Sequence, residues 1–139
     1  MIKTLLIFIG ISTILMSDFS KNNNVIVDNK TNLSWEDVDN PKLNWQDALN
    51  HCNTLILEGY DDWRLPNRNE LLSITNYNYY IPAVNPIFSH TSSSVYWTST
   101  TRTDENINFH AWTVNFINGS AKYINKINEC NVRCVRNIE

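Results

Sequence analysis

Glycine is scarce in this sequence, with only three residues among 139. The chain accordingly lacks the Gly-rich loop that cradles phosphate groups and the sharp turn that presents a nucleophilic serine. Its three histidines, His51, His90 and His110, are scattered and do not have the spacing of metal ligands. We therefore expect a protein that is not an enzyme and has no catalytic residues, metal centre or cofactor. With so little glycine, turns must come from Asn, Asp, Ser and Pro.

An excess of positive charge is also lacking. The chain has 14 acidic and 11 basic residues, and its formal net charge is −3 at pH 7. A mildly acidic chain argues against nucleic acid, or any other polyanion, as the main partner. Five Trp, six Tyr and five Phe supply enough large side chains for the core of one domain.

The N-terminal apolar run is too short to span a membrane. Leu5–Met16 contains 12 residues without a charge, compared with the roughly 20 that a span requires. Such a run is typical of a signal-peptide core, and Leu15 and Ser17 fit the −3 and −1 positions of a cleavage site. We expect residues 1–17 to be a signal peptide, with an uncleaved anchor as the alternative. The protein is then exported, to the periplasm, the cell surface or the medium, and keeps no membrane span. Residues 18–24 are polar and are expected to form a flexible lead-in.

Alternation of apolar and polar residues predicts six strands. They are residues 25–27, 33–35, 95–100, 111–116, 121–124 and 131–136. The first two are expected to form a hairpin. Asn118-Gly119 is the strongest two-residue hairpin signal in the chain. A two-residue turn there places Phe116 opposite Ala121, and Val114 opposite Tyr123.

Two helices are predicted between these strands. Asn44 is expected to cap the first, and Gly59 to end it. Its apolar stripe consists of Trp45, Ala48, Leu49, Cys52, Leu55 and Ile56. Cys52 therefore points into the core. The second helix begins after Asn67 and runs to about Thr75. Strands and helices that are segregated along the chain in this way indicate an α+β fold.

Residues 62–71 join a short extended segment to the second helix. Pro66 ends the extended segment, and Asn67 and Glu70 have the spacing of a capping box. This structural hub consists of Trp63, Arg64, Pro66, Asn67 and Glu70. Arg64 is expected to pair with nearby carboxylates or backbone carbonyls rather than to bind an anionic ligand.

Two long loops, residues 76–94 and 101–110, show no sustained periodicity. Loops of this length in a compact domain are often functional. Their tyrosines are suited to stacking on sugar rings, and their amides and charged groups to hydrogen bonding. The candidate ligand-binding residues are Tyr77, Tyr79, Tyr80, Arg102, Asp104, Glu105, Asn106 and Asn108. The alternative is a solvated loop whose aromatic rings are tucked into the core. The acidic segment 36–41 lacks the ligand spacing of an EF-hand and is expected to be a solvated turn rather than a calcium site.

Several ordered motifs together resemble one family. They are Val27-Asp28 with Thr31, Leu33 and Trp35; Trp45, Ala48 and Cys52; Asp62 to Asn67 with Glu70-Leu71; Tyr96 to Ser99; Ala111-Trp112 with Val114, Phe116 and Gly119; and Val132 to Arg136. Over residues 25–136 the chain resembles the bacterial domain family named after the C-terminal domain of the Legionella collagen-like protein. The resemblance implies a C-type-lectin-like fold, with two helices packed on a twisted antiparallel sheet and long irregular loops. It also implies an exported or surface protein and, in the named member, adhesion to sulfated polysaccharides as a trimer. The collagen-like stalk on which that trimer depends is absent here.

The resemblance also bears on the three cysteines, of which at least two are expected to pair in an exported protein. In lectin-like folds a disulfide ties the first helix to the last strand, which implies a Cys52–Cys134 bond. That bond closes a loop of about 80 residues and is worth about 4–5 kcal/mol in the chain-entropy model. Cys130 is then a free thiol or a link to a second chain, which would make a dimer. A Cys130–Cys134 bond is the alternative and needs a tight turn.

The expected function is therefore binding. Calcium-dependent lectins use a Glu-Pro-Asn or Gln-Pro-Asp loop and a Trp-Asn-Asp strand, whereas this chain has Asn85-Pro86-Ile87 and Trp112-Thr113-Val114. We expect a non-enzymatic domain that recognises carbohydrate or a surface polysaccharide through its long loops. The alternative is a protein-binding domain or a structural, pilus-like surface subunit.

Overall fold

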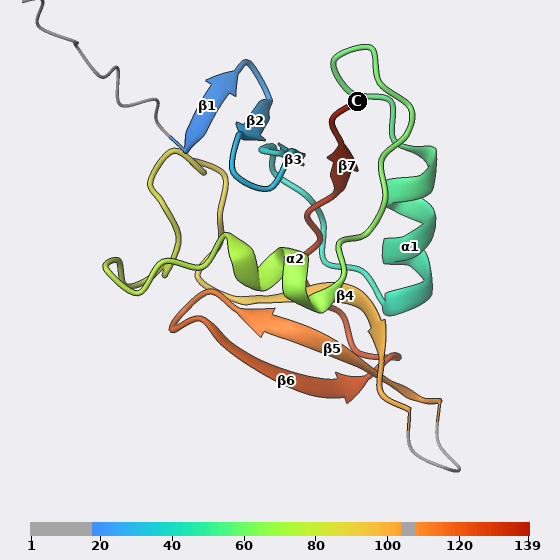
Figure 1. Ribbon diagram of the computed structural model, residues 1–139. Helices are drawn as coiled ribbons and strands as arrows, with labels where there is room; N and C mark the ends of the chain where they lie inside the picture. The colour runs from blue at the N-terminus through green and yellow to red at the C-terminus, as the bar shows by residue number, and fades with distance from the viewer. Residues whose placement is uncertain (1–17, 104–107) are drawn as a thin grey trace, which may run out of the picture.

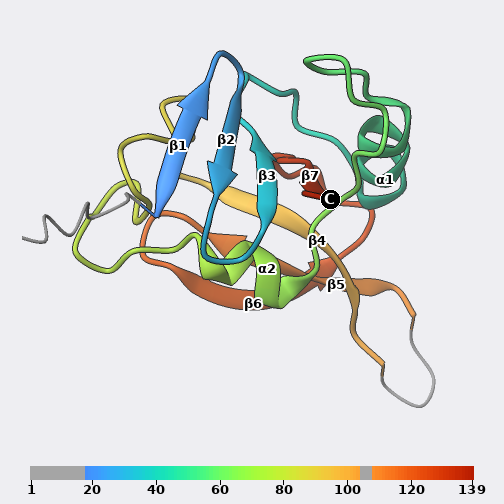
Figure 2. The ribbon, with the colours of Figure 1, turned by 45° about the horizontal axis from the view of Figure 1, so that its top comes forward.

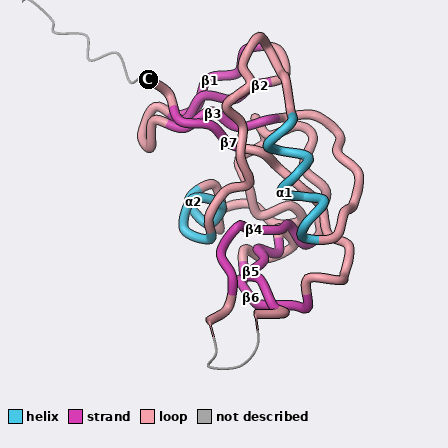
Figure 3. The backbone as a smooth tube through the Cα atoms, turned by 90° about the vertical axis from the view of Figure 1, so that its right-hand side faces the viewer, coloured by secondary structure: helices cyan, strands magenta, loops and turns pink. Residues whose placement is uncertain are grey.

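The computed structural model describes residues 18–103 and 108–139 and has an α+β fold (Figure 1). In this part of the chain the elements are β1 (Phe19–Asn22), β2 (Val25–Asp28), β3 (Leu33–Glu36), α1 (Trp45–Thr54), α2 (Arg68–Ser73), β4 (Val95–Thr101), β5 (His110–Asn115), β6 (Ser120–Asn125) and β7 (Val135–Asn137). They form two antiparallel sheets; α2 lies between the sheets, and α1 lies at the side of the molecule next to β7 (Figures 1 and 3). The predicted signal peptide lies outside the described residues. Among the helices described, none is long and apolar enough to cross a membrane.

The first sheet has the strand order β1-β2-β3-β7 and joins the two ends of the described chain (Figure 2). The predicted hairpin is present as β2 and β3. The expectation of a flexible lead-in was wrong, because β1 pairs with β2 and Phe19 packs edge-on against Phe88 at 5.3 Å. The last predicted strand is a strand only from Val135 onward. It pairs with β3 of the first sheet.

The second sheet has the order β4-β5-β6, and its hairpin register differs from the predicted one by two residues. Val114 lies opposite Ala121 instead of Tyr123, so four residues form the turn. Phe116 leaves the ladder because its N–H donates to the carbonyl of Ser94 and its own carbonyl accepts from Ala83. The long loop 76–94 has therefore replaced β6 as the partner of Phe116.

The two helices start where the sequence predicts. The side chain of Asn44 accepts a hydrogen bond from the N–H of Asp47 at 3.0 Å and caps α1. That helix ends at Thr54, five residues before Gly59, and the chain turns so that Ile56 is 75% exposed rather than part of the buried stripe. Thr54 contributes to this early end by donating its hydroxyl to the carbonyls of the preceding turn. The capping box of α2 is confirmed.

Two apolar clusters fill the interior. One lies around Trp35, Leu71 and Phe116 and joins the first sheet to α2 and the second sheet. The other surrounds the Cys52–Cys134 disulfide and includes Trp63. Because the two clusters use both faces of the second sheet, β4 and β5 are the most deeply buried part of that sheet, while β6 remains largely exposed.

The acidic segment 36–41 begins inside the protein, so the expectation of a solvated turn was wrong for its first two residues. The side chain of Asp37 is 0% exposed, and that of Arg133 is 2% exposed. Arg133 donates to Asp37 at 3.1 Å, and Lys21 donates to the same carboxylate at 2.6 Å. Backbone N–H groups of Ser89 and His90 complete the set. A buried carboxylate is retained here because several donors from distant segments surround it.

Candidate functional site

The two loops predicted to carry the ligand-binding residues lie at opposite ends of the second sheet. The N–H of Ile81 donates to Ile117, beside the β5–β6 turn. Arg102 bonds through its N–H to the carbonyl of His110, at the first residue of β5. The six residues of β5 separate these points by about 17 Å at 3.3–3.4 Å per residue (Figure 1). The exposed tyrosines of the first loop and Arg102 of the second therefore lie on separate surfaces.

The first of these surfaces is the tyrosine loop, residues 76–81. Tyr77 and Tyr80 are 76% and 72% exposed, and Tyr79 is 41% exposed. The alternative that these rings are tucked into the core was wrong. Ala83 and Phe88 are the buried anchors that follow the loop, and the Tyr77 hydroxyl donates to the carbonyl of Gly119 at 3.4 Å.

At the other end, the start of α2 and the end of β4 enclose a groove of about 510 Å³. We call it the arginine groove. It is lined by Asn67, Arg68, Asn69, Thr100, Thr101, Arg102, Thr103 and Trp112. The capping box sets the first turn of α2, and the N–H of Arg68 donates to the hydroxyl of Thr100 at 2.9 Å. This bond ties the helix to the sheet and gives the groove a fixed wall. Asn108 is exposed in the adjacent loop, whereas Asp104, Glu105 and Asn106 lie outside the described residues.

Two neighbouring aromatic rings beside this groove carry a stacked guanidinium at each end of the pair. The guanidinium of Arg68 lies 4.5 Å from the centre of the Trp112 ring, and that of Arg102 lies 3.8 Å from the centre of the Tyr123 ring. Trp112 and Tyr123 are direct neighbours across β5 and β6, with ring centres 5.5 Å apart. Stacking holds each guanidinium in one plane, and the edge of Arg68 is left for hydrogen bonding. In residues 18–103 and 108–139, the Arg68 guanidinium has no hydrogen bond or ion pair.

Sequence reasoning identified Arg102 but missed Arg68, Trp112 and Tyr123. One signal was present, because strand alternation put Trp112 and Tyr123 on the same face of the hairpin. Nothing in the sequence showed that α2 covers only the Val114 end of that face, or that its first residue reaches Trp112.

The hub residues bond to one another and to neighbouring segments. Arg64 makes two hydrogen bonds of 2.8 Å to the carboxylate of Glu70. Partial burial alone would raise the pKa of Glu70, but Arg64 and the N–H of Asn67 outweigh it and lower that pKa. Trp63 is buried and donates from its indole to the carbonyl of Tyr60. The carbonyl of Pro66 accepts from Ser99.

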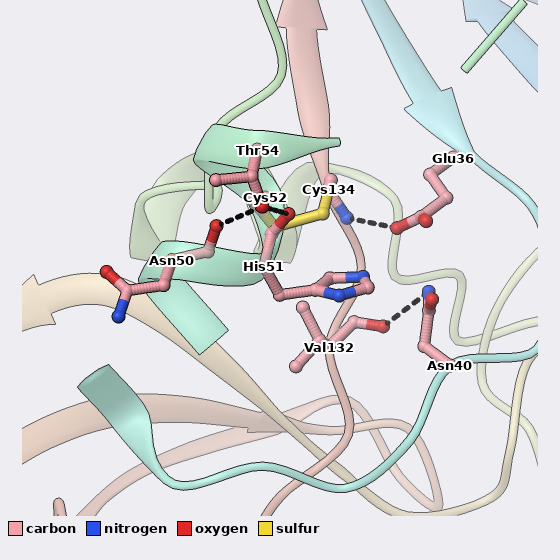
Figure 4. The surroundings of a disulfide bond; sticks show 8 residues. All are labelled: Glu36, Asn40, Asn50, His51, Cys52, Thr54, Val132 and Cys134. Carbon is pink, nitrogen blue, oxygen red and sulfur yellow. Dashed lines mark hydrogen bonds between the residues drawn. A yellow bond between two sulfur atoms is a disulfide. The ribbon is translucent and has the colours of Figure 1, made fainter. Parts of the chain in front are cut away.

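The Cys52–Cys134 disulfide is present and links α1 to the segment before β7 (Figure 4). Cys130 has no disulfide partner in the described chain. Its side chain is buried, and burial raises the pKa of the thiol to about 11. A bond from Cys130 to a second chain would therefore require the residues that cover it to move.

Comparison with known proteins supports the resemblance seen in the motifs. The model of a family described as the Lcl C-terminal domain matches residues 24–136, which is most of the chain. No curated protein matches the chain.

Proposed function

The chain belongs to the Lcl C-terminal domain family, and we propose that it is an exported, non-enzymatic domain that binds carbohydrate. We also propose that its fold is C-type-lectin-like. Two helices, antiparallel sheets, long loops and a disulfide from the first helix to the segment before the last strand all support this assignment. Its place of action would be the periplasm, the cell surface or the medium.

The observation that carries the binding proposal is the stacked row of Arg68, Trp112, Tyr123 and Arg102 beside the arginine groove. Sugars present many hydroxyl groups at fixed angles, and planar guanidinium groups offer donors at fixed angles in return. Asn and Thr side chains on the groove walls add donors and acceptors. Because stacking already orients the arginines, little side-chain entropy is lost on binding. The groove volume of about 510 Å³ also lies within the range of small-ligand sites.

The tyrosine loop favours the alternative, a protein-binding or structural surface subunit. Tyr77, Tyr80 and Ile81 are 76%, 72% and 54% exposed. Tyrosine is enriched in the centres of protein interfaces. An adjacent groove of about 360 Å³, bounded by Tyr79 and Tyr80, would take a side chain of a partner.

A glycan-binding screen of the purified, oxidised protein, with and without calcium, tests the proposal. Arg68→Gln should weaken binding about 10- to 100-fold, because charge-assisted hydrogen bonds are worth about 1.5–3 kcal/mol. Lys30→Gln, an exposed change in the turn between β2 and β3, is the matched control and should bind normally. Tyr80→Ser tests the other surface.

The outcomes separate the two functions. Loss of binding in Arg68→Gln alone would support the arginine groove, and loss in Tyr80→Ser alone would move the sugar site to the tyrosine loop. A screen with no ligand, on protein shown to be folded by its near-UV circular dichroism, would overturn carbohydrate binding and favour a protein partner.

A further inference from the structure

Three residues from separate segments bring metal-ligand atoms together inside the protein. They are Glu36 at the end of β3, His51 in α1 and Cys134 before β7. One donor atom from each lies within 4.8 Å of the other two. Figure 4 shows the His51 imidazole extending from α1 into the space beside Cys134, on the side of Glu36 and Asn40. Because these residues are far apart in the sequence, their spacing gave no metal-site signal.

Two polar atoms in this cluster are left without a partner. Oε1 of Glu36 and Nε2 of His51 are buried, and neither has a hydrogen bond to any residue that the structure describes. Glu36 is 1% exposed, and its other oxygen accepts from the N–H of Cys134 at 2.8 Å. The amide of Asn40 donates to the carbonyl of Val132 at 3.2 Å and also interacts with the Glu36 carboxylate. An orphaned buried polar atom costs about 1–3 kcal/mol. Both atoms are therefore available to a single group that binds to them.

The three donor atoms lie close enough together to approach one zinc ion. Zinc lies about 2.0–2.1 Å from histidine nitrogen and carboxylate oxygen and about 2.3 Å from thiolate sulfur. Ligand atoms around such an ion are therefore about 3.3–3.8 Å apart, so side-chain rotations that draw the atoms together by about 1 Å would suffice. In the oxidised protein the sulfur of Cys134 is bonded to the sulfur of Cys52 and is not a thiolate. Reduction would turn both sulfurs into ligands.

We propose that reduction of the Cys52–Cys134 disulfide creates a buried Zn²⁺ site made of Glu36, His51, Cys134 and Cys52. A donor set of two thiolates, one imidazole and one carboxylate suits zinc better than calcium or magnesium. In the reduced chain, zinc would replace the disulfide as the cross-link between α1 and the segment before β7, and it would also bind Glu36 of β3. Zinc bound in this way would keep the reduced chain folded.

Each chemical step balances. A trialkylphosphine reduces the disulfide: the S–S bond breaks, two thiols form, and the phosphine becomes its oxide with oxygen from one water molecule. Zinc then binds the two sulfurs as thiolates and releases their two protons to solvent. A phosphine is preferred to a dithiol because a dithiol would itself bind zinc.

The test is zinc binding to the full-length protein before and after phosphine treatment, measured by native mass spectrometry. Absorption with Co²⁺ as a spectroscopic substitute reports thiolate ligation. We expect one zinc per reduced chain and none per oxidised chain. His51→Ala and Glu36→Gln should each weaken zinc affinity by more than the 10- to 100-fold typical of outer-shell changes. His110→Ala, a histidine at the far end of β5, is the matched control and should bind as the unchanged chain does.

A Cys130 variant distinguishes the proposed site from a different zinc site, because reduction also leaves Cys130 and Cys134 as two thiols that could bind zinc together. Cys130→Ala should keep zinc binding, and its loss would overturn the proposed ligand set. Binding that survives both His51→Ala and Glu36→Gln would overturn it as well. If the reduced chain unfolds without metal, added zinc should restore its near-UV circular dichroism, and a failure to do so would also refute the proposal.

Discussion

Asp37→Asn tests whether the buried charge network holds the domain together. Asp37 is fully buried and accepts hydrogen bonds from Arg133, Lys21 and the Ser89–His90 backbone. Burial alone would raise the pKa of Asp37, but Lys21 and Arg133 hold that pKa well below its usual range. The carboxylate is therefore charged at neutral pH. The substitution keeps the shape of the side chain, removes this charge and turns one acceptor into a donor.

The expected loss of stability is large. Removing one partner of a buried ion pair costs about 3–5 kcal/mol, because the remaining charge is left buried without compensation. Here that charge belongs to Arg133, whose side chain is 2% exposed. A domain of this size has a free energy of unfolding of about 5–15 kcal/mol, so the change removes a substantial part of it. Asp39→Asn, an exposed change two residues away, should alter stability by less than about 0.5 kcal/mol.

Urea unfolding of the oxidised protein measures the effect. With a slope of about 2 kcal/mol per M, a loss of about 4 kcal/mol lowers the midpoint by about 2 M without changing the slope. The double variant Asp37→Asn/Arg133→Met should lose less than the sum of the two single losses, because neither charge is then left alone. A midpoint for Asp37→Asn equal to that of Asp39→Asn would refute the assignment of Asp37 to a structural ion pair.

Three further predictions concern stability. Cys52→Ala/Cys134→Ala should lower the free energy of unfolding by about 4–5 kcal/mol, because the bond closes a loop with a sequence separation of 82; urea midpoints that match those of the oxidised parent would contradict this. Gly119→Ala should lower the melting temperature more than Gly59→Ala does. Both glycines have φ near +80°, but only a Cβ at Gly119 would meet a side chain, Cε1 of Tyr77 at 2.8 Å. Equal shifts in melting temperature would show that this contact is unimportant. The pKa of Glu70 is lowered in the folded state, so its contribution to the free energy of unfolding is present above the unfolded pKa of about 4.5 and is lost as the pH falls through the folded pKa. Glu70→Gln should therefore flatten the pH dependence of stability in this acidic range. An unchanged slope would argue against the Arg64–Glu70 pair as its source.

Local interactions explain which parts of the fold could be predicted from the sequence. The caps at Asn44 and Asn67 join residues three apart, and Pro66 restricts the backbone of its immediate neighbours. The β2–β3 hairpin likewise depends on a short turn and on strand alternation. The disulfide was predicted from the family resemblance, which relates distant positions that local patterns do not connect.

Several of the predictions that failed depended on distant residues. The β5–β6 register moved by two residues because the 76–94 loop bonds to Phe116. Strand alternation was unaffected, since a shift of two leaves every side chain on the same face. Asp37 is buried because Arg133, 96 positions later in the chain, supplies its counter-charge.

The sequence by itself determined the helix starts, the first hairpin, the alternation of the strands and the family, because these depend on residues close in the chain or on an ordered set of motifs. Only the tertiary structure decided which side chains share a site. It separated the tyrosine loop from the arginine groove by the length of β5, and it brought Arg68 onto Trp112 and His51 beside Glu36. The physical reason is that a site is made by the packing of elements against one another, and the positions of those contacts follow from the whole core rather than from any one segment.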